Sequence, residues 1–491
     1  MEKRKRLVIA LVLVLSCAEI SWAQQRGSLP GSIATTPSSG SGQQTSQPAG
    51  DIAEAETEKA RPGTAVVAPL SGAHDLSPGS EGRARSYLVP SLQWTGSADT
   101  NSSNVPGGSR RETRSTVLGS ITLQRVGKHS QLNLDYAGGG FFYSRRLESS
   151  LGTNPLTNGM IHRAGFTQIL AWERWKLLLD DRLLYLPESA FGFGGFGGLG
   201  SFGGGSGGSY LADAPALNPT LEPNQTILTG RSERLSNVVA TQAEYRPGAR
   251  SALTVTGTYG TLFFLNSPLM DNRYWALLAG YNFALSRRDV LAITYGHYLY
   301  QLGVGNREIL NRGFQLAYGR KITGRLSLEL SGGPMANDIA KPLGGSVLRS
   351  FWTTYDSLQY RFRKGSVGIS FRRQMTGGSG LLLGAESRVA ELSAGRQFWR
   401  TVYASLNLGH AYNQSLTQES SASRRTKYEA WQGGAMLSRE LGQHMSLYVN
   451  YHVQRQISND PLCFGDNCGT VRLRHLGGIG INWHGRPMRL D

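Results

Sequence analysis

The sequence lacks the features that mark several common protein classes. Past its N-terminus it contains no run of eighteen apolar residues, which excludes a membrane protein built from helices. It has no His-Glu-x-x-His, no Gly-x-Ser-x-Gly and no clustered pair of carboxylates, so we expect neither an enzyme nor a cofactor or metal site. No nucleic-acid recognition motif accompanies the net charge of +17, and we expect no nucleic-acid partner.

The N-terminus has the layout of an export signal. Four basic residues near the start precede an apolar run, and Ser21-Trp22-Ala23 supplies a small-x-small cleavage site. This pattern predicts a signal peptide over residues 1–23 and an exported mature chain. An alternative is a lipoprotein processing site at Cys17, which the bulky Leu15 disfavours.

Residues 24–85 are rich in Ser, Gly, Thr, Pro, Gln and Ala and contain few large apolar side chains. Such a composition cannot bury enough apolar surface to offset the entropy of ordering the chain. We therefore expect a low-complexity, disordered tether on the periplasmic side of the protein.

Of the three cysteines, Cys17 leaves with the signal peptide, and Cys463 and Cys468 remain. A close cysteine pair in an exported protein predicts a disulfide that closes one loop. A metal site would need further ligands at close spacing, and none stand near this pair.

The clearest strand pattern lies between residues 427 and 456. Apolar residues at 445, 447, 449, 451 and 453 alternate with mostly polar ones, which is the period of a strand with two unlike faces. A second alternating run precedes it, and a short polar turn joins the two into a hairpin. Each run has about a dozen residues, longer than the modal strand of a soluble sheet and long enough to cross a membrane.

The same pattern recurs along residues 86–483 and predicts about eighteen strands. The connections after even-numbered strands are short, whereas most of those after odd-numbered strands are longer and rich in Gly, Ser, Asn and Pro. Short turns on one side and long loops on the other are typical of bacterial outer-membrane barrels. An even strand number also places both chain ends on the side of the short turns.

With this export signal, strand length and loop asymmetry, residues 86–483 resemble the Gram-negative outer-membrane β-barrel proteins and are porin-like in size. The resemblance implies an all-β fold, a transmembrane antiparallel up-and-down barrel, in contact with outer-membrane lipid and with the outer-membrane assembly machinery. These barrels usually end on a strand with a terminal aromatic residue. Here a short tail, residues 484–491, follows Trp483. No feature of the sequence indicates the oligomeric state.

In a barrel that spans lipid, the apolar face points outward and the polar face lines the interior. Many of the basic residues sit at the short turns, where they can reach lipid headgroups. Other polar and charged residues are predicted to line the pore, and the four arginines among them would favour anions. The predicted pore-lining residues are Glu329, Arg312, Arg372, Asn407, Asn450, His452, Arg472 and Arg474.

The longest predicted loop covers residues 187–231 and contains a glycine-rich stretch with spaced phenylalanines. It is not a phosphate-binding loop, because no Lys-Ser or Lys-Thr follows it. In classical porins the corresponding loop folds into the lumen, so we predict a constriction or plug, with a surface loop as the alternative. The phenylalanines that would form it are Phe191, Phe193, Phe196 and Phe202.

The sequence therefore predicts a channel for the passive passage or export of small, anionic solutes across the bacterial outer membrane. An alternative is a non-conducting barrel with a structural or surface-interaction role. A third is an outer-membrane hydrolase, in which His452 would pair with a serine of a neighbouring strand.

Overall fold

The computed structural model describes residues 70–71, 86–100, 112–143, 158–186, 227, 233–265, 269–303, 307–340, 345–416, 425–459 and 471–490. The predicted signal peptide, almost all of the tether, most of loop 187–231 and both Cys463 and Cys468 lie outside these residues. Within the described part of the chain, no helix is long and apolar enough to cross a membrane.

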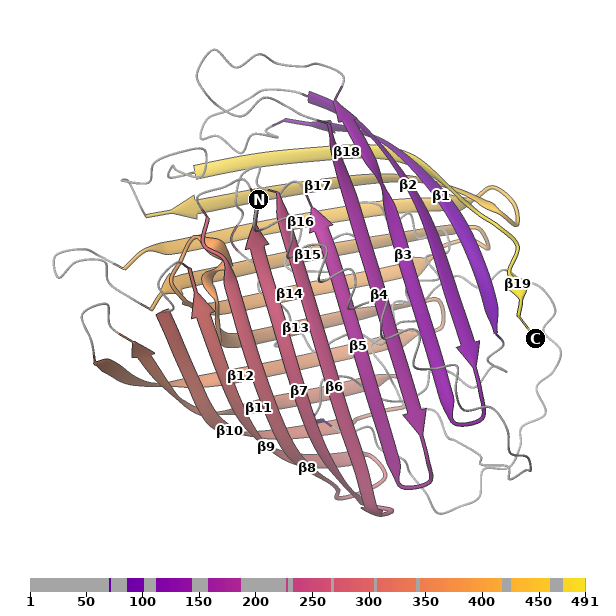
Figure 1. Ribbon diagram of the computed structural model, residues 1–491. Helices are drawn as coiled ribbons and strands as arrows, with labels where there is room; N and C mark the ends of the chain where they lie inside the picture. The colour runs from indigo at the N-terminus through magenta and orange to yellow at the C-terminus, as the bar shows by residue number, and fades with distance from the viewer. Residues whose placement is uncertain are drawn as a thin grey trace.

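The described chain is built almost entirely from long strands (Figure 1). The strands are β1 (Tyr87–Asp99), β2 (Glu112–Val126), β3 (Ser130–Tyr143), β4 (Gly159–Ala171), β5 (Trp175–Leu186), β6 (Arg234–Gly248), β7 (Ser251–Phe264), β8 (Asn272–Ala284), β9 (Asp289–Leu302), β10 (Arg307–Lys321), β11 (Leu326–Ala340), β12 (Ser346–Phe362), β13 (Gly365–Thr376), β14 (Ala385–Gln397), β15 (Val402–Ser415), β16 (Lys427–Glu440), β17 (Met445–Ser458), β18 (Val471–His484) and β19 (Met488–Arg489). One short 3-10 helix, η4 (Gly378–Gly380), stands between β13 and β14.

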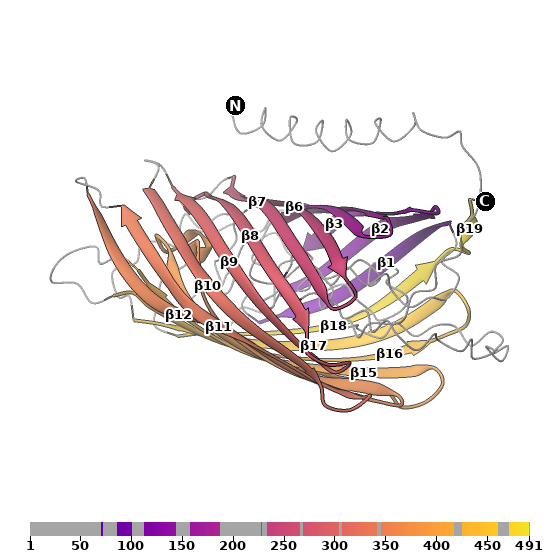
Figure 2. The same cartoon turned by 90° about the horizontal axis from the view of Figure 1, so that it is seen from below.

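The strands form one closed antiparallel barrel. Each of β1 to β17 pairs with the next strand in sequence, and β1 pairs with β18 from Ser91–His484 to Asp99–Leu476. Figures 1 and 2 show the two facing walls, with β3–β9 in one and β13–β18 in the other. The predicted eighteen-strand, up-and-down barrel, and with it the resemblance to porin-like proteins, is confirmed at the level of the fold.

The connections have the predicted asymmetry. Only two to four residues join each even-numbered strand from β2 to β16 to the next one, whereas residues 187–233 separate β5 from β6. β11 continues to Ala340 and β12 begins at Ser346, so the connection between these two odd- and even-numbered strands is also short. The Gly333-Pro334 pair lies within β11 and interrupts only its pairing with β10, which resumes at Met335.

The two faces of each strand are inverted relative to a soluble barrel. On β17, the polar residues Ser446, Asn450 and Gln454 are buried, whereas Val449 and Tyr451 are exposed. Leu316 on β10 and Leu408 on β15 are likewise exposed, by 55% and 46%. A large apolar outer surface of this kind is stable in lipid and not in water.

The C-terminal tail extends the closure of the barrel. β19 pairs with Tyr87 and Leu88 of β1, and Gly485 donates a backbone hydrogen bond to the carbonyl of Pro90 at 2.8 Å. The tail therefore covers the part of the β1 edge that β18 does not reach, and an uncovered strand edge is prone to pair with other chains.

Candidate functional site

The candidate site is the inner face of the barrel. Seven of the eight predicted pore-lining residues lie on this face, because each stands in the same alternation as the inward-facing residues of its strand and of the strands paired with it. These seven are Glu329, Arg372, Asn407, Asn450, His452, Arg472 and Arg474. Arg312 is the exception. It is exposed on β10 between the outward Leu310 and Phe314, so its placement in the pore is wrong. Strict alternation with Leu310 and Phe314 places Arg312 on the outer face.

Charged groups of both signs line the interior and are paired. Arg474 on β18 donates from Nε to Asp99 Oδ2 on β1 at 2.8 Å, with both side chains largely buried. Arg372 on β13 lies 3.5 Å from the carboxylate of Glu391 on β14. Such pairing satisfies charges that would otherwise be costly to bury.

A second group of pairs follows β3 to β6. Arg163 lies 3.9 Å from Asp135, and Asp180 accepts hydrogen bonds from Arg182 Nε at 2.8 Å and from Thr167 Oγ1 at 2.7 Å. Glu244 is paired with Arg246. The inner wall on this side therefore carries acidic and basic groups side by side, paired either within one strand or between neighbouring strands.

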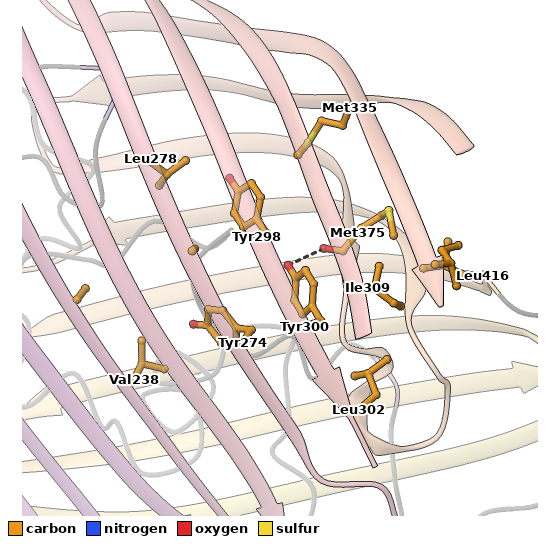
Figure 3. Packing of buried hydrophobic residues seen from close by; sticks show 13 residues of the cluster. Val238, Tyr274, Leu278, Tyr298, Tyr300, Leu302, Ile309, Met335, Met375 and Leu416 are labelled. Carbon is orange, nitrogen blue, oxygen red and sulfur yellow. Dashed lines mark hydrogen bonds between the residues drawn. The ribbon is translucent and has the colours of Figure 1, made fainter. Parts of the chain in front are cut away.

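One part of the interior is apolar, which corrects the expectation of a polar lining throughout. An inner apolar cluster is contributed by six strands and by Leu416, and Figure 3 shows ten of its side chains by name. It consists of Val238, Ala240, Tyr274, Ala276, Leu278, Tyr298, Tyr300, Leu302, Ile309, Met335, Ile339, Met375 and Leu416. Tyr300 on β9 donates to the carbonyl of Met375 on β13 at 3.3 Å, so walls four strands apart touch here.

The connection between β13 and β14 lies against this cluster. The backbone N–H of Met270 donates to the carbonyl of Gly380 at 2.9 Å, and Leu416 N–H donates to Gly384 at 3.2 Å. Gly380 and Gly384 have φ values of +80° and +76°, and a Cβ at either would overlap Phe264 or Ile309. Only glycine fits both the backbone conformation and the space.

The long loop also reaches this region. Ile227 is the only residue between Leu186 and Glu233 that the structure describes, and it is 1% exposed. It packs with Leu382, Ala385 and Tyr428. The predicted constriction residues Phe191, Phe193, Phe196 and Phe202 lie outside the described residues, so their role stays a prediction.

The hydrolase alternative depends on the surroundings of His452. His452 faces the interior, but its cross-strand partners are Gly434 on β16 and Leu476 on β18, and neither is a serine. Over the described ranges, no three His, Cys, Asp or Glu side chains are grouped so that they could hold a metal ion.

Sequence reasoning missed three parts of this interior: the apolar cluster, the β13–β14 connection and Leu70–Ser71, which lie inside the barrel. The sequence contains an indication of the β13–β14 connection and of Leu70–Ser71. Three leucines, 381–383, stand in a glycine-rich loop, and an apolar run ends at Leu70 in an otherwise polar tether. Apolar residues in a segment of this composition indicate a docking point.

No family model and no curated protein matches the chain. Solved structures of similar fold include OpdL of Pseudomonas aeruginosa, at 11% identity and a TM-score of 0.40, covering 83% of this chain and 99% of that chain. OccK2 (OpdF) of the same organism, in complex with glucuronate, has 11% identity and a TM-score of 0.42 over 83% and 98% of the two chains. A BenF-like porin from Pseudomonas fluorescens Pf-5 has 10% identity and a TM-score of 0.40 over 83% and 99%. TM-scores and identities this low carry no argument about this chain. The evidence for the barrel is the pairing of its own strands.

Proposed function

We propose that the protein is a channel of the bacterial outer membrane that passes small solutes. The observation that carries this proposal is the inverted barrel: its outer face is apolar, and its inner face carries polar and charged side chains on most strands. A barrel of eighteen strands encloses more volume than side chains alone fill. Interior polarity of this kind is what a water-filled passage requires.

We further propose that the solutes are anionic. Arg372, Arg472 and Arg474 lie on the inner face, and Arg372 is at the level where β13 faces the apolar cluster. Asp99 and Glu391 balance part of this charge, so the preference for anions should be moderate.

Arg372 and its neighbour Arg373 provide a matched test, because the two point to opposite faces of β13. Arg372→Gln should lower the anion-to-cation permeability ratio by up to about fivefold. The interaction energy of two unit charges 4 Å apart in water is about 1 kcal/mol, which corresponds to about a fivefold change in an equilibrium. Arg373→Gln should leave the ratio unchanged. The measurement is the reversal potential in a planar bilayer under a salt gradient. Equal ratios in both variants would contradict an arginine-lined passage.

A second candidate is a barrel that does not conduct and serves as a structural or surface-interaction protein. The inner apolar cluster and the buried Ile227 favour it, because they fill part of the interior. A folded protein that stays silent in bilayers would support this candidate over the channel.

Ile227 tests whether the long loop narrows the passage. Ile227→Ala should weaken its packing against Leu382 and Tyr428 by about 2–4 kcal/mol, as for other buried large-to-small changes. Single-channel conductance should then rise as the loop loses its anchor. Ile322→Ala, at an exposed residue of a short turn, is the control and should change nothing. An unaltered conductance in Ile227→Ala would count against a constricting loop.

We propose no catalytic role for the chain. The absence from the sequence of His-Glu-x-x-His and Gly-x-Ser-x-Gly supports this proposal. The purified barrel should therefore show no hydrolysis of phospholipid or peptide that is lost in His452→Ala.

A further inference from the structure

Two residues of the predicted periplasmic tether, Leu70 and Ser71, lie inside the barrel. They contact a site that we call the lumen dock, formed by Thr254 on β7, Gly280 and Asn282 on β8, and Gly319 on β10. Each dock residue is within a few positions of a short turn, at the end of the barrel where β1 begins. Leu70 and Ser71 thus have defined contacts within a segment whose composition predicts disorder.

All the polar groups of Ser71 are bound by the dock. Its N–H donates to Asn282 Oδ1 at 3.0 Å, and Asn282 Nδ2 donates to Ser71 Oγ at 2.5 Å. Ser71 Oγ lies 2.7 Å from Thr254 Oγ1, which also donates to the Ser71 carbonyl. One donor arrangement satisfies all four bonds, with the serine hydroxyl donating to the threonine. Ser71 is 3% exposed.

The shape of the wall fits this segment. A Cβ at Gly280 would overlap the Oγ and Cβ of Ser71, and a Cβ at Gly319 would lie 2.9 Å from Cδ2 of Leu70. Between these glycines, the inner face carries Ala292 on β9 and Ala317 on β10, and both are buried. Small residues on three neighbouring strands thus leave room beside the polar groups of Thr254 and Asn282.

We propose that the lumen dock is a binding site for a short serine-containing peptide segment, and that Leu70–Ser71 of the same chain occupies it. The asparagine amide recognises a main-chain N–H and a hydroxyl together, which a serine residue offers and a larger side chain would not. The occupied dock narrows the passage at the short-turn end. This last consequence rests on the proposed channel function, whereas the docking itself does not.

A disulfide test measures the docking directly. In Ser71→Cys/Thr254→Cys, oxidation should join residues 71 and 254, because the two side chains are in contact and a disulfide needs Cα atoms within about 7 Å. Ser71→Cys/Thr116→Cys, with the second cysteine on the inner face of β2, should give no bond. Peptide mapping identifies the bond and separates it from any that involves Cys463 or Cys468. A folded, oxidised barrel without the 71–254 bond overturns the proposal.

A steric test measures the consequence. Gly280→Ala should displace Ser71 and raise the single-channel conductance of the full mature chain. Gly368→Ala is the matched control, since Gly368 is also an inward glycine near a short turn, and its added Cβ would meet only Ser393 Oγ at 3.2 Å and Gln359. No increase in Gly280→Ala relative to Gly368→Ala would overturn the narrowing.

The two tests separate the failure of the dock from the failure of the channel. A barrel that conducts but forms no 71–254 bond contradicts the dock and leaves the channel standing. A barrel that forms the bond but never conducts, with either glycine substituted, contradicts the channel and the narrowing and leaves the dock standing.

Discussion

Leu408→Arg should destabilise the folded barrel by about 2–4 kcal/mol, the cost of placing arginine on the lipid face near the bilayer midplane. Leu408 lies near the middle of β15, and its outward neighbours across the sheet are Leu392 and Gly433. Neither of these two neighbours offers a polar partner to a guanidinium, so the charge would have to reach the interface or draw water into the lipid. The measurement is the free energy of unfolding in urea from lipid vesicles.

The adjacent residue supplies the control. Asn407 occupies the inner face of the same strand, opposite Ser393 and Gly434. Asn407→Arg should stay within about 0.5 kcal/mol of the parent protein, as for a substitution that disturbs no buried contact. Equal destabilisation by both substitutions, or a larger effect at Asn407, would show that the two faces have been assigned the wrong way round.

Arg474→Gln should destabilise the barrel by about 3–5 kcal/mol, because it removes one partner of a buried ion pair and leaves the Asp99 carboxylate inside. This pair joins β18 to β1, the two strands that close the barrel. Its loss should therefore appear as a lower free energy of unfolding, measured as for Leu408→Arg.

Two comparisons identify the cause of that loss. Asp99→Asn/Arg474→Gln should recover part of the stability, since it removes both charges. Arg388→Gln breaks a pair with Glu386 that is 2.9 Å long but stands on the outer face, with Arg388 47% exposed, and should cost at most about 1 kcal/mol. If the double variant were no more stable than Arg474→Gln, the buried-charge explanation would be wrong.

The barrel could be predicted from the sequence because the pattern that specifies its strands lies between residues close together in the chain. A strand of a lipid-spanning barrel repeats every two residues, and β17 shows this repeat without a break from Met445 to Ser458. The short turns then fix the order and direction of the strands. The same repeat places Arg312 on the outer face, because it stands between Leu310 and Phe314, and its charge alone does not indicate the pore.

The interior could not be predicted in the same way, because its contacts join residues far apart in the chain. Tyr300 meets Met375 only because the barrel brings β9 and β13 together across its interior. Ser71 lies 183 residues before Thr254 and 211 before Asn282. The polar composition of the tether predicts no fixed position for Ser71. The space that Ser71 occupies is left by small residues on β8 to β10, which are far from it in the sequence.

These contacts give the proposed passage two distinct ends. Near the short turns, the lumen dock holds Leu70 and Ser71 against β7, β8 and β10. At the loop end, the apolar cluster, the β13–β14 connection and Ile227 occupy one side of the interior. The charged pairs of β1, β18 and β3 to β6 line other parts of the wall. Solutes would therefore pass along the charged walls.

The most direct test is the single-channel conductance of residues 24–491, refolded in detergent and inserted into a planar bilayer at two salt gradients. An anion-selective channel should give steady openings, with a reversal potential on the anion-selective side. The contradicting result would be a variant with both Gly280→Ala and Ile227→Ala that is folded, as shown by heat-modifiable migration on gels, and yet gives no conductance in the bilayer.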